Sequence, residues 1–280
     1  MLAVKNNSKY DLETIYYFTD EVVNKIGVKN IGRPSKLNIP EVLTIGIYRY
    51  IVGGINWKSY YQTIERDYRR YFPDLPHYNN FICLLKKYTI LMFQLLIMLI
   101  KDTNVKEGVF IIDSTPLKVC DNVRIREHKT FVRYARRGKN GKGYWYGFKL
   151  CLIIDIYGNI VSFKVDKASK HDLKLGKELV KNLKGMLIAD RGFIDNKWAK
   201  ELFEQELLLI TPPRKNMKKI TTQSQLDVLK IRQKIEGILS VLKRFYNLES
   251  TLYRSVKGYI NHIILVMLSY QIKKIFLANS

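Results

Sequence analysis

The chain has 280 residues, 47% of them hydrophobic, which is enough for one large domain or two modest ones. Lysine and arginine number 48 against 25 acidic residues, and the net charge of +23 predicts a polyanionic partner. Nucleic acid is favoured over a membrane surface or an acidic protein, because the basic residues are spread along the chain and mixed with 19 tyrosines.

Several other classes of protein are disfavoured. The three cysteines form no CxxC pair and the four histidines lack metal-ligand spacing, so we expect neither a disulfide framework nor a zinc site. No glycine-rich loop of the Walker type is present, which disfavours an ATPase. The N-terminus has no apolar signal region, and the apolar run 89–100 is too short to span a membrane, so we expect a cytoplasmic protein that makes no membrane contact.

The first hundred residues show helical periodicity. The pattern predicts helices over residues 10–27, 40–54, 57–70 and 78–101. Helix 57–70 mixes basic and aromatic residues, which fits a helix presented to DNA phosphates and equally a solvated amphipathic helix. The pattern changes near residue 105, so we expect a helical domain over 1–105 and a second domain over 106–280.

The second domain alternates between strand and helix patterns. Short apolar runs predict strands at 108–112, 146–155, 160–165, 185–189 and 207–210, and helices at 172–183, 196–205 and 225–246. Asp172 would serve as a cap or first-turn acid of its helix. The order β-β-β-α-β-α-β-α predicts an α/β fold with a mixed five-stranded sheet flanked by helices.

Two acidic residues directly follow predicted strands. Asp113 follows the first strand and Asp190 the fourth, and right-handed crossovers would place these strands side by side and parallel. Carboxylates so close repel each other, and a shared proton, an arginine or a divalent cation would relieve the repulsion. Oxygen ligands favour magnesium or manganese over zinc.

The last predicted helix carries a third acid. Glu236 shares one edge of the helix with Arg232 and Lys243, away from the apolar stripe. Taken alone, a solvated Arg-Glu pair explains Glu236 better than a catalytic role. The expected buried stripe consists of Ile231, Ile235, Ile238, Leu242 and Phe245.

Five short motifs follow one another in the second domain. They are Ile112-Asp113-Ser114-Thr115-Pro116, Tyr146-Gly147-Phe148-Lys149-Leu150, Ala189-Asp190-Arg191-Gly192-Phe193, Arg214-Lys215-Asn216-Met217-Lys218 and Arg232-x3-Glu236-x6-Lys243. In this order the chain resembles bacterial insertion-sequence transposases of the DDE type, over about residues 108–275. Many relatives open the last motif with a tyrosine where this chain has Leu229.

The resemblance implies a fold, an activity and a set of partners. The fold would be ribonuclease H-like, and the activity metal-dependent cleavage and strand transfer at insertion-sequence ends. Asp113, Asp190 and Glu236 would hold two Mg²⁺ or Mn²⁺ ions, with Arg232 and Lys243 gripping phosphates. The partner would be double-stranded DNA, which includes the terminal inverted repeats of the element and the target DNA. The N-terminal domain would bind the DNA ends, and two copies of the protein would form a homodimer in the DNA complex. The protein would act in the bacterial cytoplasm.

A basic segment separates the first two predicted strands. Residues 118–149 contain ten lysines or arginines against Asp121 and Glu127, which predicts a DNA-binding surface or, alternatively, a mobile loop without specific contacts. The expected DNA contacts are Arg133, Arg136, Arg137, Lys139, Lys142 and Lys149 to phosphates, Trp145 for stacking, and a smaller patch of Arg214, Lys215 and Lys218.

Two further functions stay open. A metal nuclease of the same fold would cut DNA without joining it. A catalytically silent DNA-binding protein would bind DNA without cutting it, although it would have no need of the three acids.

Overall fold

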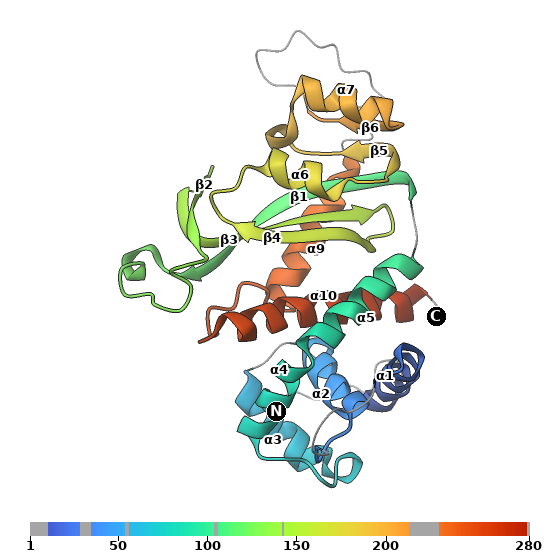
Figure 1. Cartoon of the computed structure of the whole chain (residues 1–280), viewed down its shortest axis with the longest axis vertical. Helices are drawn as coiled ribbons and strands as arrows, with labels where there is room; N and C mark the ends of the chain where they lie inside the picture. The colour runs from blue at the N-terminus through green and yellow to red at the C-terminus, as the bar shows by residue number, and fades with distance from the viewer. Residues whose placement is uncertain are drawn as a thin grey trace. The chain divides into compact units, whose positions relative to one another are not determined.

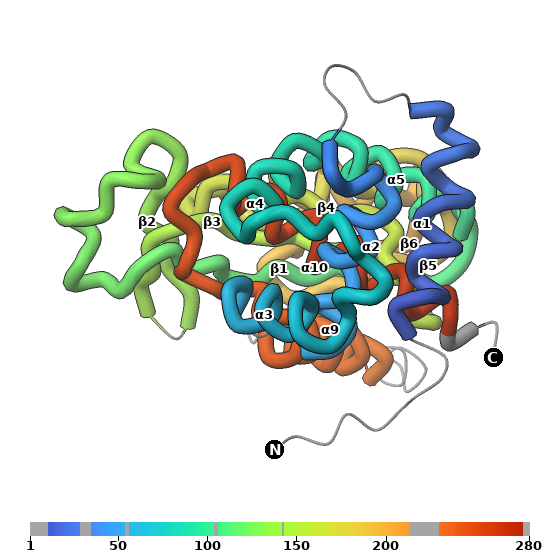
Figure 2. The backbone as a smooth tube through the Cα atoms, turned by 90° about the horizontal axis from the view of Figure 1, so that it is seen from below, coloured from blue at the N-terminus to red at the C-terminus, as the bar shows by residue number. Residues whose placement is uncertain are grey.

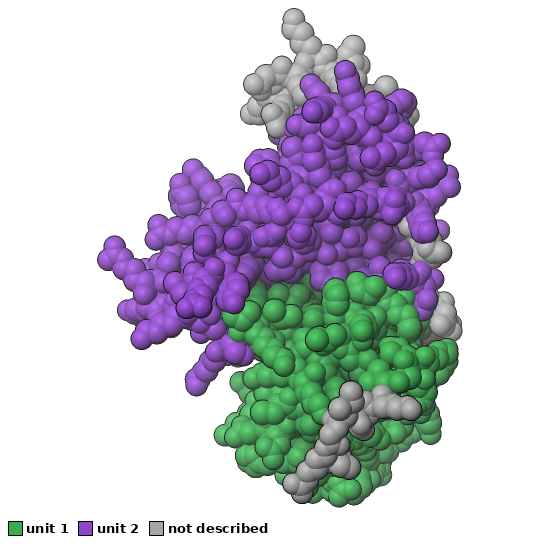
Figure 3. All heavy atoms as spheres, viewed as in Figure 1, with its two compact units in different colours: residues 1–99, 244–248, 256–280 green, residues 100–243, 249–255 purple. Residues whose placement is uncertain are grey.

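The computed structural model describes residues 11–28, 35–53, 56–103, 106–141, 143–212 and 230–278. The chain forms two compact units (Figure 3): unit 1 comprises residues 1–99, 244–248 and 256–280, and unit 2 comprises residues 100–243 and 249–255. The expected boundary near residue 105 lies close to the first change of unit. The C-terminal residues, however, group with the N-terminal helices and not with the second domain.

The C-terminal helix explains this grouping. Helix α10 (Val256–Ala278) has no polar face, and residues 261–272 are all buried. A helix that is apolar all round must be covered on every side. It is tied to the N-terminal helices by Asn261, which donates to the Leu85 carbonyl (3.1 Å), and by Ser269, which donates to the Ile47 carbonyl (3.3 Å).

The expected N-terminal helices are present, with one difference. The single helix expected over 78–101 is two helices that meet at Tyr88 with a bend of 53°, where Thr89 Oγ1 donates to the Lys86 carbonyl (2.8 Å). The helices are α1 (Leu12–Ile26), α2 (Ile39–Ile51), α3 (Trp57–Asp67), the short η1 (Arg69–Tyr71), α4 (Tyr78–Lys87) and α5 (Thr89–Asp102).

Within the described ranges, no single helix is long and apolar enough to cross a bilayer, and only the bent pair of α4 and α5 passes together.

Unit 2 is built on a mixed sheet (Figure 1). Its strands are β1 (Glu107–Cys120), β2 (Arg136–Asn140), β3 (Gly143–Asp155), β4 (Ile160–Lys167), β5 (Lys184–Ile188) and β6 (Leu207–Ile210). The order is β2-β3-β1-β5-β6, with β4 also paired to β3. Pairs β1-β3, β2-β3 and β3-β4 are antiparallel, whereas β1-β5 and β5-β6 are parallel. The expected mixed sheet flanked by helices is confirmed.

Two features of the sheet differ from expectation. Strand β1 does not end before Asp113 but continues to Cys120, because β3 remains its antiparallel partner over that whole length. Strand β2 was expected as part of a loop. Its residues Arg-Arg-Gly-Lys-Asn carry no strand pattern, and pairing with the start of β3 alone makes them a strand.

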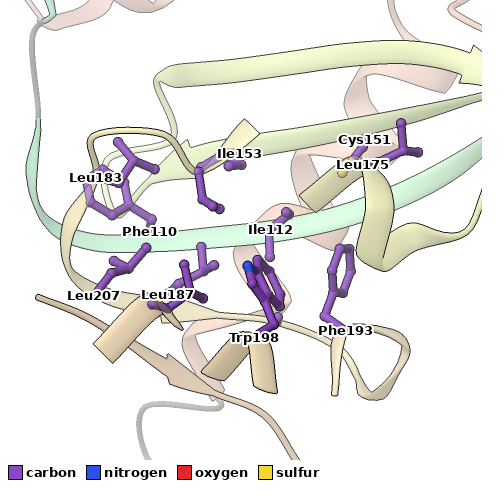
Figure 4. Packing of buried hydrophobic residues seen from close by; sticks show 13 residues of the cluster. Phe110, Ile112, Cys151, Ile153, Leu175, Leu183, Leu187, Phe193, Trp198 and Leu207 are labelled. Atoms are coloured by element: carbon purple, nitrogen blue, oxygen red, sulfur yellow. The ribbon is translucent and has the colours of Figure 1, made fainter. Parts of the chain in front are cut away.

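The two faces of the sheet are covered by different helices. Phe110 and Ile112 of β1 and Ile153 of β3 pack in a core with α6 (Asp172–Leu179) and α7 (Asn196–Glu204) (Figure 4). Helix α9 (Gln233–Arg244) crosses the other face (Figure 1). Its buried residues are Ile235, Leu239 and Leu242, so the expected stripe was partly wrong: Ile231 and Phe245 lie toward the ends of the helical segment and are exposed.

Candidate active site

Asp113 and Asp190 are brought together by the register of two parallel strands. Ile111 of β1 pairs with Ile188 of β5, and each acid lies two residues beyond this pair. Both acids therefore sit at equivalent positions on the sheet face opposite α6, on strand paths about 4.8 Å apart. Because β5 ends at Ile188, the edge of β1 beside Asp113 is open. The expected convergence of these acids follows from this register.

Glu236 and Arg232 complete the cluster. Glu236 is in the first turn of α9, and Arg232 directly precedes the helix. The guanidinium of Arg232 contacts Glu236 Oε1 through Nη2 (2.7 Å) and Asp190 Oδ1 through Nη1 (3.6 Å). The Arg232–Glu236 pair, which was expected on the helix surface, therefore faces Asp190, the carboxylate that follows β5. The structure thus gathers four of the predicted site residues.

The electrostatics of Asp113 show how crowded the site is. The pKa of Asp113 is raised to about 6, mainly by burial, and the nearby charges of Asp190 and Glu236 act in the same direction. The N–H of Ser114, which donates to Asp113 Oδ1 (2.7 Å), and the charge of Arg232 oppose this rise. Among the described residues, the Arg232 guanidinium is the cation that acts on these three carboxylates, so the site favours additional positive charge.

The chemistry of these side chains fits a hard divalent cation. All three acids offer oxygen atoms, the ligands that Mg²⁺ and Mn²⁺ prefer. In the part of the chain that the structure describes, no group of three or more His, Cys, Asp or Glu side chains is arranged to hold a metal ion. In this arrangement Asp190 and Glu236 each pair with Arg232.

Lys243 lies apart from this cluster. It is seven residues beyond Glu236, or roughly 10 Å along the helix. Its ammonium pairs with Glu249 Oε1 at 2.7 Å. The two residues expected to grip phosphates therefore have different surroundings: Arg232 belongs to the acid cluster and Lys243 does not.

The basic segment between β1 and β3 is folded. Phe131 and Ala135 are buried in it, and His128 stacks on Phe131. Figure 2 shows the segment extending beyond the end of the sheet. Four of the predicted DNA contacts are exposed on it: Arg133, Arg136, Arg137 and Lys139. Arg136 also donates to the carbonyl of Ala135 (2.8 Å).

Two of the predicted DNA contacts have enclosed side chains in this structure. Trp145 is 3% exposed, and its Nε1 donates to the Phe148 carbonyl (3.1 Å), so its ring is enclosed by protein and not open to a base. Lys149 is 8% exposed and pairs with Asp172 Oδ1 (2.9 Å), so it has no free access to phosphate. The predicted contacts Lys142, Arg214, Lys215 and Lys218, and also Leu229, lie outside the described residues.

Asp172 and Ser114 were not expected to meet. Asp172, expected only as a cap or first-turn acid, accepts a hydrogen bond from Ser114 Oγ at 2.7 Å. The two residues are 58 positions apart, and no local pattern reveals their contact. The one signal in the sequence that could have drawn attention to Asp172 is its position as a carboxylate at the start of the helix that follows β4.

A family model and a solved structure are similar to this chain. The family model described as transposase DDE domain matches residues 103–256, just over half of the chain. No curated protein matches. A solved synaptic complex of the piggyBac transposase with hairpin DNA is similar over 96% of this chain and 76% of that one, at 11% identity and a TM-score of 0.47. From the family match, the chain belongs to the transposase DDE domain family.

Proposed function

We propose that this protein cuts DNA at the ends of a bacterial insertion sequence and joins those ends to target DNA. Asp113, Asp190 and Glu236 would hold two divalent metal ions, Mg²⁺ or Mn²⁺. The observation that carries the proposal is the convergence of these acids on Arg232 at one open sheet edge. The family match supports the same class of reaction.

The three acids divide into two kinds of support. Asp113 and Asp190 stand on the sheet, where strand pairing limits their movement, and Glu236 stands on a helix. Divalent ions in such a site activate an attacking hydroxyl and stabilise the leaving oxygen of a phosphodiester. The resemblance to DDE transposases implies that Asp113 would be the ligand shared by both ions. The Ser114 N–H donates to Oδ1 of Asp113, which leaves Oδ2 of the same carboxylate for a metal ion.

Arg232 would change partners during the reaction. In the described structure its guanidinium compensates Asp190 and Glu236. With cations supplying that compensation, the same guanidinium becomes available to a DNA phosphate, whose oxygens it fits well. Lys243 would contact a more distant phosphate after release from Glu249.

DNA would be held by more than the acid site. The exposed basic side chains of Arg133, Arg137 and Lys139 on the folded basic segment would contact phosphates. The helical unit 1 would recognise the terminal repeats. The net charge of +23 supports a polyanionic partner. We further propose a homodimer that brings two ends together, acting in the cytoplasm.

Salt dependence tests the role of the basic segment. The variant Arg133→Gln, Arg137→Gln, Lys139→Gln should make the slope of log K against log salt less negative by about 2 to 3, because each lost phosphate contact reduces its magnitude by about 0.9. Binding to a duplex is measured by fluorescence anisotropy between low and moderate salt. The matched control is Lys181→Gln, Lys197→Gln, Lys200→Gln, which removes the same charge from exposed positions after α6 and on α7. Equal slopes in the two variants would contradict the assignment.

Cleavage assays separate the proposed function from its alternatives. The DNA flanking the gene is searched for short inverted repeats, and end-labelled duplexes carrying them are incubated with Mg²⁺ or Mn²⁺ and a target plasmid. A transposase gives nicked ends and joint molecules. Nicks without joints indicate a nuclease. Binding without nicks under either metal indicates a silent DNA-binding protein.

A further inference from the structure

Asp172 lies in a small polar cluster behind the acid site. Its Oδ1 accepts from Ser114 Oγ (2.7 Å) and pairs with Lys149 Nζ (2.9 Å), which also donates to the Lys170 carbonyl (2.9 Å). Lys149 is largely enclosed, so loss of Asp172 would leave a charge with little access to water. The cluster is therefore a built arrangement and not a loose surface pair.

The cluster and the three acids lie on opposite faces of the sheet. Side chains alternate along a strand, so Ser114 points away from the face of Asp113. Ser114 also pairs across the sheet with Cys151, which belongs to the core beneath α6. Asp172 is consequently on the wrong face to be a fourth ligand of ions held by Asp113.

A single residue connects the two faces. The backbone N–H of Ser114 donates to Asp113 Oδ1 at 2.7 Å, while the Ser114 hydroxyl donates to Asp172. The hydroxyl contact restrains the same residue whose N–H orients the Asp113 carboxylate. Any change at Asp172 is thus transmitted to Asp113 through one peptide unit.

Asp172 is also held firmly and lies close to the second acid-bearing segment. In α6, Leu175 is buried, and a side chain added at Gly176 would come within 3.2 Å of both Phe193 and Trp198. A side chain added at Gly192 would lie 3.5 Å from Asp172 Oδ2. Asp172 therefore touches the segment after Asp113 and faces the turn after Asp190.

We infer that Asp172 is a positioning residue of the acid site: it holds Ser114, and through it the carboxylate of Asp113, at a fixed place relative to the turn that follows Asp190. Lys149 supports this role by fixing the Asp172 carboxylate from the enclosed side. The inference rests on the proposed metal-holding function of Asp113. It assigns to the Lys149 ammonium a structural task inside the catalytic unit, in place of a contact with DNA.

The principal variant of the test, Ser114→Ala, removes the hydroxyl link and leaves the Asp172–Lys149 pair intact. Ser114→Ala deletes the donor, Ser114→Thr keeps a hydroxyl, and Asp172→Asn weakens the acceptor. Ser162→Ala on β4 is the matched control for loss of a strand hydroxyl elsewhere in the sheet. Four quantities are measured: Mn²⁺ affinity of the DNA-free protein by calorimetry, single-turnover cleavage rate, DNA affinity without metal, and Tm.

For Ser114→Ala we expect Mn²⁺ affinity and cleavage rate to fall together, by about 10- to 100-fold, as when a hydrogen-bond partner of a metal ligand is lost. DNA affinity and Tm should stay close to wild type, and Ser114→Thr should recover most of the loss. Asp172→Asn, if it folds, should show the same metal defect. Ser162→Ala should behave as wild type.

Distinct results would overturn the inference. Wild-type Mn²⁺ affinity in Ser114→Ala would show that the hydroxyl does not position Asp113. An equal loss of Mn²⁺ affinity and cleavage rate in Ser114→Thr and Ser114→Ala would show that the hydroxyl is not the group that positions Asp113. Wild-type protein that neither binds Mn²⁺ nor cleaves DNA would overturn the proposed function, and this inference with it, whereas a functional wild type with unaffected variants overturns the inference alone.

Discussion

Asp113→Asn is expected to abolish DNA cleavage while making the metal-free protein more stable. Asparagine keeps the shape of aspartate and the oxygen that accepts from the Ser114 N–H, but it cannot carry the negative charge needed for cation binding. Loss of several kcal/mol of charge stabilisation in the transition state corresponds to at least about a 10³-fold slower reaction. Cleavage within tenfold of wild type would contradict the proposed role.

The gain in stability has a defined pH range. The folded-state pKa of Asp113 is raised to about 6, above the unfolded value near 3.9, so the folded protein binds the proton more tightly between these values. Wild-type stability therefore falls as pH rises from about 4 to 6, and the asparagine variant escapes this loss. Allowing for solvent screening, the difference above pH 6 is on the order of 1 to 2 kcal/mol.

Thermal unfolding of both proteins with EDTA, at several pH values, measures this difference. The two Tm values should be close near pH 4 and diverge up to about pH 7. The matched control is Asp155→Asn, a buried acid that accepts hydrogen bonds from the N–H groups of Tyr157 and Asn159 and from the Asn159 side chain. Because Asp155 is well satisfied, its replacement should lower Tm. A fall of Tm in Asp113→Asn at neutral pH would contradict the electrostatic description of the site.

Gly147→Ala is expected to disrupt the sheet next to the site. Gly147 has a φ of +151°, and a Cβ there would lie 2.1 Å from the Leu117 carbonyl oxygen. Leu117 is on β1, four residues beyond Asp113, and neither backbone can move without breaking strand pairing. The cost is about 3 kcal/mol or more, which corresponds to a Tm roughly 6 to 12 °C lower.

Gly141→Ala is the matched control, because a Cβ at Gly141 meets no atom within 4 Å among the described residues and the position is close by in sequence. Its Tm should stay within about 2 °C of wild type. Both variants are compared by thermal unfolding, and cleavage is assayed below the lower Tm. A Gly147→Ala protein as stable as Gly141→Ala would show that β1 and β3 separate at little cost.

The sequence predicted the parts of unit 2 that depend on local pattern. Continuous apolar runs such as 108–112 and 185–188 form strands because they are buried on both faces, and their periodicity is visible without knowledge of partners. The meeting of Asp113 and Asp190 was also predictable, since right-handed crossovers leave few arrangements of parallel strands. The helical nature of the first hundred residues followed from spacing alone.

Residues whose surroundings come from distant segments were predicted less well. Lys149 and Trp145 stand in a basic, aromatic stretch that resembles a DNA-binding surface, yet both side chains are buried, and Lys149 donates to the Lys170 carbonyl in the segment that leads into α6. Strand β2 has no strand pattern and exists through pairing with β3. The C-terminal helix joins unit 1 because its apolar surface needs other helices, which lie more than 150 residues away in sequence.

Composition and periodicity are properties of each segment, so the sequence by itself determined the positive charge that favours a polyanionic partner, the mixed sheet and the two acids that follow the apolar cores of strands β1 and β5. Glu236 was different, because an Arg-Glu pair on a helix has the same pattern whether it stands alone on the helix surface or faces another carboxylate. The tertiary structure alone decided this, by placing the Arg232–Glu236 pair against Asp190. It also decided that Lys149 faces Asp172, because burial of a charge depends on which distant residue neutralises it.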